Sequence, residues 1–144
     1  MIDALFTGLV RGFILILGSV GILAFFLRVV LFENENIEKT GQNIKYDMLV
    51  LKKYEVDIKG PIFDTMLAHY LIDPDGRHGM DILAEQYLNY IPVSIKELIG
   101  GRGKPETMRD VEIDKVVEYA GEDADITLQL KYALAPLVDA EELK

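Results

Sequence analysis

The chain opens with an apolar stretch and continues with apolar and polar positions at helical spacing. Gly12 to Leu27 is an uncharged run of 16 residues, and the apolar run continues to Phe32 if the Arg28 side chain reaches out to a polar boundary. A helix that spans a membrane needs about 20 apolar residues, within a range of about 17–25. Residues 1–32 are therefore borderline in length for a membrane-spanning helix.

Three interpretations of residues 1–32 stay open. The segment is a membrane anchor, a helix buried in a globular core, or a stretch that is not native to the rest, encoded by a truncated or shifted reading frame. A cleaved signal peptide is disfavoured, because no Lys or Arg precedes Arg11 and no cleavage site of small residues follows.

The pattern after residue 33 predicts a helix-rich domain with a few short strands. The predicted helices cover residues 44–54, 65–73, 80–90, 95–99 and 114–134, and the predicted strands cover residues 56–58 and 62–63. Asp64 or Thr65 is expected to cap the second helix, and Ser94 opens a capping box. The sequence therefore predicts an α/β fold in which helices dominate.

The last predicted helix carries an apolar stripe that we expect to face the core. Its members recur every three or four residues, as one face of a helix requires. The stripe consists of Ile113, Val117, Ala120, Ala124 and Leu128.

Composition excludes several kinds of site. The chain has 144 residues, of which half are hydrophobic and 27% are charged, and this suits one folded domain. It has no cysteine, so disulfides and thiolate zinc sites are excluded. Its two histidines, His69 and His78, lack partners at metal-binding spacing, and we expect both to be structural.

Charge is distributed unevenly along the chain. Residues 1–32 carry one acid and two bases, whereas residues 33–144 carry 23 acids and 13 bases, and the net charge is −9. An acidic chain does not favour a broad nucleic-acid groove, although nucleases concentrate carboxylates at their metals. The break at Phe32–Glu33 separates an apolar segment, residues 1–32, from the rest of the chain.

Two acids and a tyrosine are the candidate chemistry. Tyr119 and Asp123 are four residues apart, and so they share one face of the last predicted helix. Asp47 lies early in its own helix. Taken alone, Asp47 is typical of a helix-surface acid and Tyr119 of a packed aromatic residue, so the case depends on their combination.

Four blocks occur in an order that points to a known family. They are GQNIKYD from Gly41, FDTMLAHYLID from Phe63, GRHGMDILAEQYL from Gly76 and YAGEDADITLQL from Tyr119. Together they resemble the 3′–5′ proofreading exonuclease domain of bacterial DNA polymerase I, the Klenow-type family A enzymes. The resemblance covers about residues 33–138 and implies an RNase H-like fold.

The resemblance implies specific roles for the candidate residues. Asp47 and Asp123 would be two of the family's four metal-binding acids, for two Mg²⁺ or Mn²⁺ ions, and Tyr119 would orient the attacking water. Three polar residues would lie along the single-stranded DNA 3′ end, and one cation would contact a phosphate. These are Gln42, Asn43 and Tyr46, and then Arg77.

The sequence departs from the family pattern at one place. The family's other two acids come from a D-x-E block on its first strand, and no such block precedes GQNIKYD here. Asp3 has no acidic partner two residues on, and Glu33 and Glu35 lie in a polar lead-in that matches nothing catalytic. We therefore expect the first strands of the sheet to be missing or replaced by the apolar segment, and hydrolysis to be impaired.

The resemblance leaves alternative functions open. The first reading is a fragment of a proofreading exonuclease, located in the bacterial cytoplasm, with residues 139–144 leading to a polymerase domain absent from this sequence. The second is a module of a polymerase that binds nucleic acid or packs without cleaving. The third is a protein that reuses the fold and is anchored in a membrane through residues 5–32.

Overall fold

The computed structural model describes residues 27–101, 103 and 107–140. The three interpretations of the apolar segment depend mainly on residues 1–26, which lie outside the described residues. Within the described part, no helix is both long and apolar enough to cross a membrane.

The described residues form two compact units. The larger consists of residues 40–47 and 62–140, and the smaller of residues 27–39 and 48–61. Strands β1 (Lys39–Gly41) and β2 (Ile62–Asp64) form a two-stranded parallel sheet. Helix α2 (Ile44–Lys52) starts in the larger unit and ends in the smaller one.

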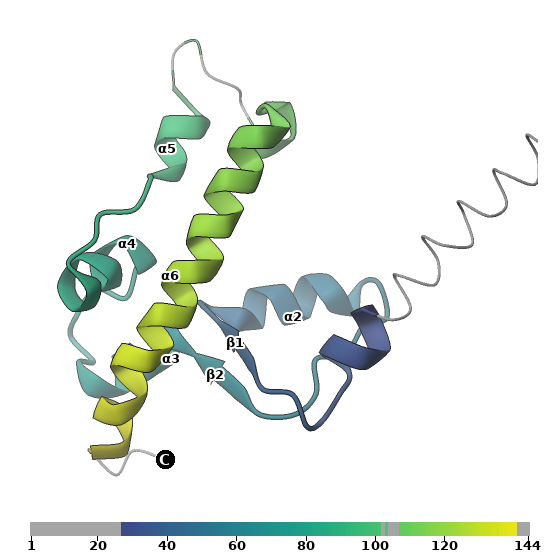
Figure 1. Ribbon diagram of the computed structural model, residues 1–144, viewed down its shortest axis with the longest axis vertical. Coiled ribbons are helices and arrows are strands. Elements are labelled where there is room, and N and C mark those ends of the chain that lie inside the picture. Colours follow the sequence, from purple (N-terminus) through teal and green to yellow (C-terminus); the bar gives the residue numbers. More distant parts are fainter. Residues whose placement is uncertain (1–26, 102, 104–106, 141–144) are drawn as a thin grey trace, which may run out of the picture. The chain divides into compact units, whose positions relative to one another are not determined.

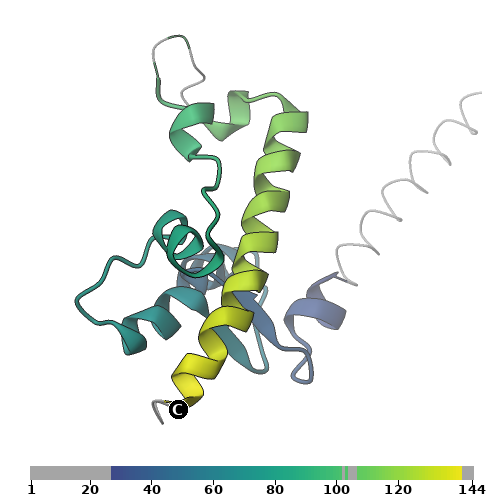
Figure 2. The same ribbon diagram turned by 60° about the vertical axis from the view of Figure 1, so that its left-hand side comes forward.

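The long helix α6 (Ile113–Ala140) is the centre of the larger unit (Figures 1 and 2). Helix α3 (Thr65–Ile72), helix α4 (Met80–Leu83) and the π-helical segment η2 (Ala84–Leu88) pack against it. Along the chain, the short helices α5 (Ile95–Leu98) and η3 (Met108–Asp110) come after η2 and before α6. The buried core between these elements consists of Ala68, Leu83, Ala84, Ile126, Leu130 and Leu134.

The prediction that the stripe beginning at Ile113 faces the core was wrong. Ile113 is 72% exposed and Val117 62% exposed, and Ala120, Ala124 and Leu128 are also exposed. The buried face of α6 is Ile126, Leu130 and Leu134, which also recur every four residues. Both stripes fit a helical period, and the packing of α3 and η2 against the C-terminal half of α6 selects the second.

One buried carboxylate caps two helices in the larger unit. Asp64 Oδ1 accepts hydrogen bonds from the backbone N–H groups of Met66 at 2.9 Å and Leu67 at 3.3 Å, at the start of α3. The same oxygen accepts from Asn43 N at 3.0 Å, and Oδ2 accepts from Ile44 N at 2.9 Å, where α2 begins. The negative charge also complements the positive ends of both helix dipoles. The predicted cap of α3 at Asp64 is confirmed.

The smaller unit contains the π-helical segment η1 (Leu27–Phe32) and is held together by backbone carbonyls that surround one amine. Lys39 Nζ donates to the carbonyl oxygens of Ile37 at 2.8 Å and of Asn34 and Lys59. Gly60 has a φ of +86°, and a Cβ there would lie 2.7 Å from the carbonyl oxygen of Glu35, so glycine is required at this turn.

Two predicted elements of the smaller unit differ from the structure. The predicted strand at residues 56–58 does not form, since these residues follow a turn in which Glu55 has a φ of +59° and Val56 N donates to Leu51 O at 3.2 Å. Helix α2 ends at Lys52 and not at Tyr54. Alternation over three residues is too short to overcome this local turn geometry.

We expect Asp64→Ala to cost about 2–4 kcal/mol of unfolding free energy, because it removes the cap of two helices at about 1–2 kcal/mol each. Urea unfolding followed by circular dichroism measures this. The control is Ser94→Ala, which removes the exposed cap of α5 alone and should cost about 1 kcal/mol or less. Equal losses for the two variants would contradict the double cap.

Leu130→Ala should destabilise the chain by about 2–5 kcal/mol, because Leu130 is 0% exposed and its loss leaves a cavity. Val117→Ala, on the stripe that the sequence pattern favours, should change the unfolding free energy by less than about 0.5 kcal/mol. Thermal and urea unfolding of both variants compare the two faces of α6. A large loss at Val117 would show that the exposed face is packed after all.

Candidate functional site

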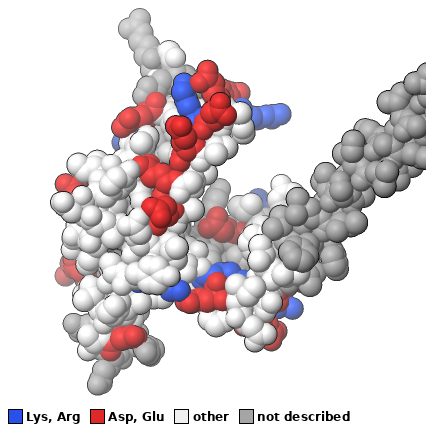
Figure 3. Space-filling model, in the orientation of Figure 1, with Lys and Arg blue, Asp and Glu red and all other residues white. Residues whose placement is uncertain are grey.

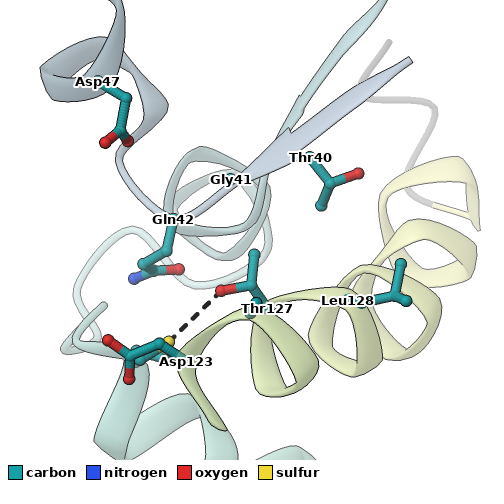
Figure 4. A pocket seen from close by; sticks show the side chains of 9 residues that line it. Thr40, Gly41, Gln42, Asp47, Asp123, Thr127 and Leu128 are labelled. Carbon is teal, nitrogen blue, oxygen red and sulfur yellow. Dashed lines mark hydrogen bonds between the residues drawn. The ribbon is translucent and has the colours of Figure 1, made fainter. Parts of the chain in front are cut away.

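A pocket of about 580 Å³ lies between the start of α2 and one face of α6 within the larger unit (Figure 4). It brings together residues from three parts of the sequence. Its lining consists of Thr40, Gly41, Gln42, Asp47, Met80, Asp123, Ala124, Thr127 and Leu128. Of the predicted site residues, Gln42, Asp47 and Asp123 are therefore neighbours in this pocket.

Tight backbone geometry positions the first side of the pocket. A Cβ at Gly41 would lie 2.9 Å from the Cβ of Ile44, so a side chain there would push against the buried first residue of α2. Asn43 then takes the left-handed conformation, with a φ of +56°, which asparagine tolerates better than most residues. This turn directs α2 so that Asp47 reaches the pocket.

Hydrogen bonds at both ends hold the Gln42 side chain. Its Nε2 donates to the backbone carbonyl of His78 at 2.8 Å, and its Oε1 accepts from the hydroxyl of Thr65, which is buried. Figure 4 shows the side chain extending toward the face of α6 that carries Asp123 and Thr127. Because both ends of the amide are engaged, Gln42 has a defined orientation in the pocket.

On α6, hydrogen bonding between Tyr119 and Asp123 contributes to the pKa of both groups. Burial raises the pKa of Asp123 above its ordinary value, the bond from Tyr119 opposes this shift, and the nearby Glu122 charge adds to it. Burial also raises the pKa of Tyr119, as do the charge of Asp123 and the bond to it. Tyr119 therefore stays protonated at neutral pH and remains a hydrogen-bond donor.

Glu122 ties α6 to the chain that follows η2. One oxygen of Glu122 accepts from the Tyr90 hydroxyl at 2.6 Å, and the other accepts from the backbone N–H of Val93 at 3.0 Å. These bonds fix the register of the first half of α6, and with it the positions of Tyr119 and Asp123.

Three predicted contact residues lie outside the pocket lining. Asn43 contributes its backbone to the turn, Tyr46 is 66% exposed on α2, and Arg77 is exposed in the loop between α3 and α4. All three remain predictions as nucleic-acid contacts.

Thr127 and Met80 are among the lining residues of the pocket that sequence reasoning missed. The Thr127 hydroxyl donates to Met80 Sδ at 3.5 Å across the pocket floor. Thr127 is four residues after Asp123, so helical spacing was the signal for it. Met80 lies at the start of α4, and no local pattern links it to α6.

Helix α6, which carries Asp123 to the pocket, has an acidic surface. On the face shown in Figure 3, Asp and Glu side chains gather along α6, where few Lys or Arg side chains lie. The acidic residues in the N-terminal half of this helix are Asp114, Glu118, Glu122, Asp123 and Asp125. A phosphate group is repelled by such a surface unless a cation neutralises it.

The pocket supplies only some of the oxygen ligands that a hard cation such as Mg²⁺ needs. Asp47 and Asp123 supply carboxylate oxygens, which Mg²⁺ and Mn²⁺ prefer. Among the residues that the structure describes, no three carboxylate or imidazole groups lie close enough together to hold a metal. A divalent ion held by these two carboxylates alone would keep most of its coordination by water.

The comparisons with known proteins agree on one family. The sequence model of a family described as 3′-5′ exonuclease matches residues 24–139. This match starts within the apolar segment, so the predicted domain limits of 33–138 stay a prediction. The members of the family generally depend on divalent metals.

The similar curated proteins are DNA polymerases I. That of Rhizobium leguminosarum is 43% identical over 115 residues, which is 78% of this chain and 11% of that protein. Those of Pseudomonas aeruginosa and Borreliella burgdorferi are each 37% identical, over 76% and 69% of this chain and 12% and 11% of their own lengths. The matches confirm the predicted family and its α/β, RNase H-like fold, over a small part of the relatives' length.

The raised pKa of Asp123 has a consequence for stability in metal-free buffer. The folded state binds a proton at this carboxyl more readily than the unfolded state does, so ionisation of Asp123 opposes folding above its ordinary pKa. Asp123→Asn should therefore unfold at a higher temperature than the parent at pH 7. The difference should vanish near pH 3, where the carboxyl is protonated in both states.

Calorimetry with a chelator present measures this effect. Asp125→Asn, at an exposed carboxylate of the same helix, is the control and should change the unfolding temperature little at either pH. A lower unfolding temperature for Asp123→Asn at pH 7 would mean that the bond from Tyr119 outweighs the burial of the charge.

Proposed function

Since the chain belongs to the 3′–5′ exonuclease family of bacterial DNA polymerase I, we propose that its pocket receives the 3′ end of DNA. The reaction is hydrolysis of the terminal phosphodiester, which releases a nucleoside monophosphate. The observation that carries this proposal is the convergence of Asp47, Gln42 and Asp123 in one pocket.

Asp47 and Asp123 would hold the divalent ion, Mg²⁺ or Mn²⁺. Their carboxylates come from the first turn of α2 and from α6, so only the folded chain brings them together. A bound ion supplies Lewis-acid polarisation of the phosphate and lowers the pKa of a coordinated water. Its charge would also make the acidic face of α6 acceptable to a phosphate.

Tyr119 would orient the attacking water. Its hydroxyl is close enough to Asp123 for the two groups to shift each other's pKa, and the raised pKa of Tyr119 keeps it in the protonated form. A neutral hydroxyl can donate to one partner and accept from another at the same time. Tyr119 can therefore position a water beside Asp123 without acting as a strong base.

The DNA end would lie along the start of α2. The Tyr46 ring is 66% exposed, and an exposed aromatic face is the usual platform on which an unpaired base stacks. Gln42 presents a fixed amide in the pocket, Asn43 lies beside it, and Arg77 offers an exposed cation for a phosphate. These contacts favour a single strand because they use base faces and backbone.

The pocket supplies two of the four metal-binding acids that the resemblance calls for, Asp47 and Asp123. The two further acids that the resemblance calls for, in a D-x-E block, do not occur before GQNIKYD. Catalytic groups that act as a unit lose activity by orders of magnitude when one is absent. A second candidate function, binding of a DNA end without cleavage, is favoured by the same finding that the described pocket holds two carboxylates and no third ligand.

The polymerase domain is the partner that we propose for the intact protein. The chain spans 11% of the Rhizobium relative and 12% of the Pseudomonas relative, and both carry the name DNA polymerase I. The parent domain would accordingly act in the cytoplasm on polymerase products.

The experiment that tests the proposal combines binding and cleavage. Mn²⁺ titration by calorimetry should show weak binding that Asp123→Ala and Asp47→Ala each abolish. A single-stranded oligonucleotide, labelled at its 5′ end so that shortening is visible, should be cleaved slowly or not at all in Mn²⁺. Any cleavage should fall by at least about a hundredfold in Asp123→Ala.

Asp125→Ala is the matched control, because this acid lies on α6 outside the pocket and should leave Mn²⁺ binding unchanged. Oligonucleotide binding that needs Mn²⁺, without cleavage, would favour the non-catalytic function. Cleavage that persists in Asp123→Ala, or Mn²⁺ binding that neither pocket acid affects, would contradict the proposed site.

A further inference from the structure

The two histidines of the chain, His69 and His78, form a close pair in the larger unit. His69 Nδ1 and His78 Nδ1 are 2.7 Å apart, and the ring centroids are separated by 4.9 Å. His69 lies on α3 and is fully buried, whereas His78 lies in the loop that joins α3 to α4. At this distance one Nδ1 carries a proton and donates a hydrogen bond, and the other Nδ1 accepts that bond.

The loop that carries His78 also reaches the pocket. The backbone carbonyl of His78 accepts the hydrogen bond from Gln42 Nε2 at 2.8 Å. Gly76 allows the loop to close, because a Cβ there would lie 2.5 Å from an oxygen of Asp73 and 3.1 Å from the His69 ring. The His78 carbonyl, which is one partner of Gln42, therefore belongs to a loop that contacts α3 through the two imidazole rings.

We propose that the His69–His78 pair positions Gln42 in the pocket, and that protonation of both rings releases it. The proposal rests on the proposed function only in taking Gln42 as a contact of the DNA end. With both rings charged, two N–H groups and two positive charges face each other at 2.7 Å. The loop then moves away from α3, and the carbonyl of His78 moves with it.

The surroundings of the pair disfavour protonation of the His69 ring. His69 Nε2 is buried and has no hydrogen-bond partner among the described residues, so a second N–H there would be unsatisfied. Burial, followed by the charge of His78, lowers the pKa of His69, and Asp73 acts against this shift. The other titratable groups in contact are the rings of Tyr87, 5.6 Å from His69, and Tyr70, 5.3 Å from His78.

The sign of the pH dependence follows from this lowered pKa. The folded state disfavours the proton on His69, so its contribution to stability is complete above the ordinary imidazole pKa of about 6.5 and declines as the pH falls below it. Release of Gln42 is therefore expected on acidification below the ordinary imidazole pKa, and not at alkaline pH.

The test follows the side-chain amide resonances of Gln42 and the imidazole resonances of both histidines by NMR in the full chain. Above pH 7 the Gln42 resonances should be constant, and on acidification they should shift together with the imidazole resonances. His69→Phe and His78→Ala should place these resonances at their acidic position already at pH 7.5. The control, Asp75→Ala in the same loop, should behave like the parent.

Anisotropy of a fluorescent single-stranded oligonucleotide gives a second readout. Affinity should fall roughly three- to tenfold between pH 7.5 and pH 5.5 in the parent, the loss expected for one positioned hydrogen-bonding group. Both histidine variants should bind with the reduced affinity at pH 7.5, and their remaining pH dependence should be small.

Gln42 resonances that do not follow the imidazole titration in the parent would overturn the proposal, even if both variants fail to fold. Unchanged Gln42 resonances in folded His69→Phe would also overturn it. If no form of the chain binds the oligonucleotide, the proposed function fails, whereas the Gln42 resonances still decide for or against the positioning role of the pair.

Discussion

The larger unit depends on one carboxylate. Asp64 is buried and accepts hydrogen bonds from four backbone N–H groups, two at the start of α2 and two at the start of α3. A buried carboxylate is stable only when its charge is compensated, and here four N–H groups and two helix dipoles compensate it. This single contact sets where α2 begins, and so where Gln42 and Asp47 lie in the pocket.

The opposite side of the pocket shows a balance between folding and chemistry. Asp123 lies partly buried beside Glu122, and both effects disfavour its charged form, while the bond from Tyr119 favours it. A cation at this place would relieve the cost of the charge. The acidic face of α6, visible in Figure 3, has the same character: it opposes phosphate binding by itself and favours it once a divalent ion is present.

The Gln42 side chain connects this pocket to the start of α3 and to the loop that follows α3. Thr65, next to the cap residue Asp64, holds one end of its amide, and the carbonyl of His78 holds the other. The histidines lack any metal-binding spacing in the sequence, and the expectation of a structural role agrees with their mutual contact. Their proximity arises because the loop after α3 folds back, which no periodicity in the sequence indicates.

The sequence by itself determined the family and the helix-rich α/β class, narrowed the cap of α3 to Asp64 or Thr65, and predicted that Asp47, Gln42 and Asp123 belong to one site. The helices and the cap follow from local spacing, in which neighbours in the chain are neighbours in space, whereas the family and the site follow from the order of several short blocks. Only the tertiary structure decided which stripe of α6 is buried, because two stripes share the same period and α3 and η2 cover one of them. It also decided that Met80 and Thr127 complete the pocket and that His69 meets His78, since each of these contacts joins residues from different elements.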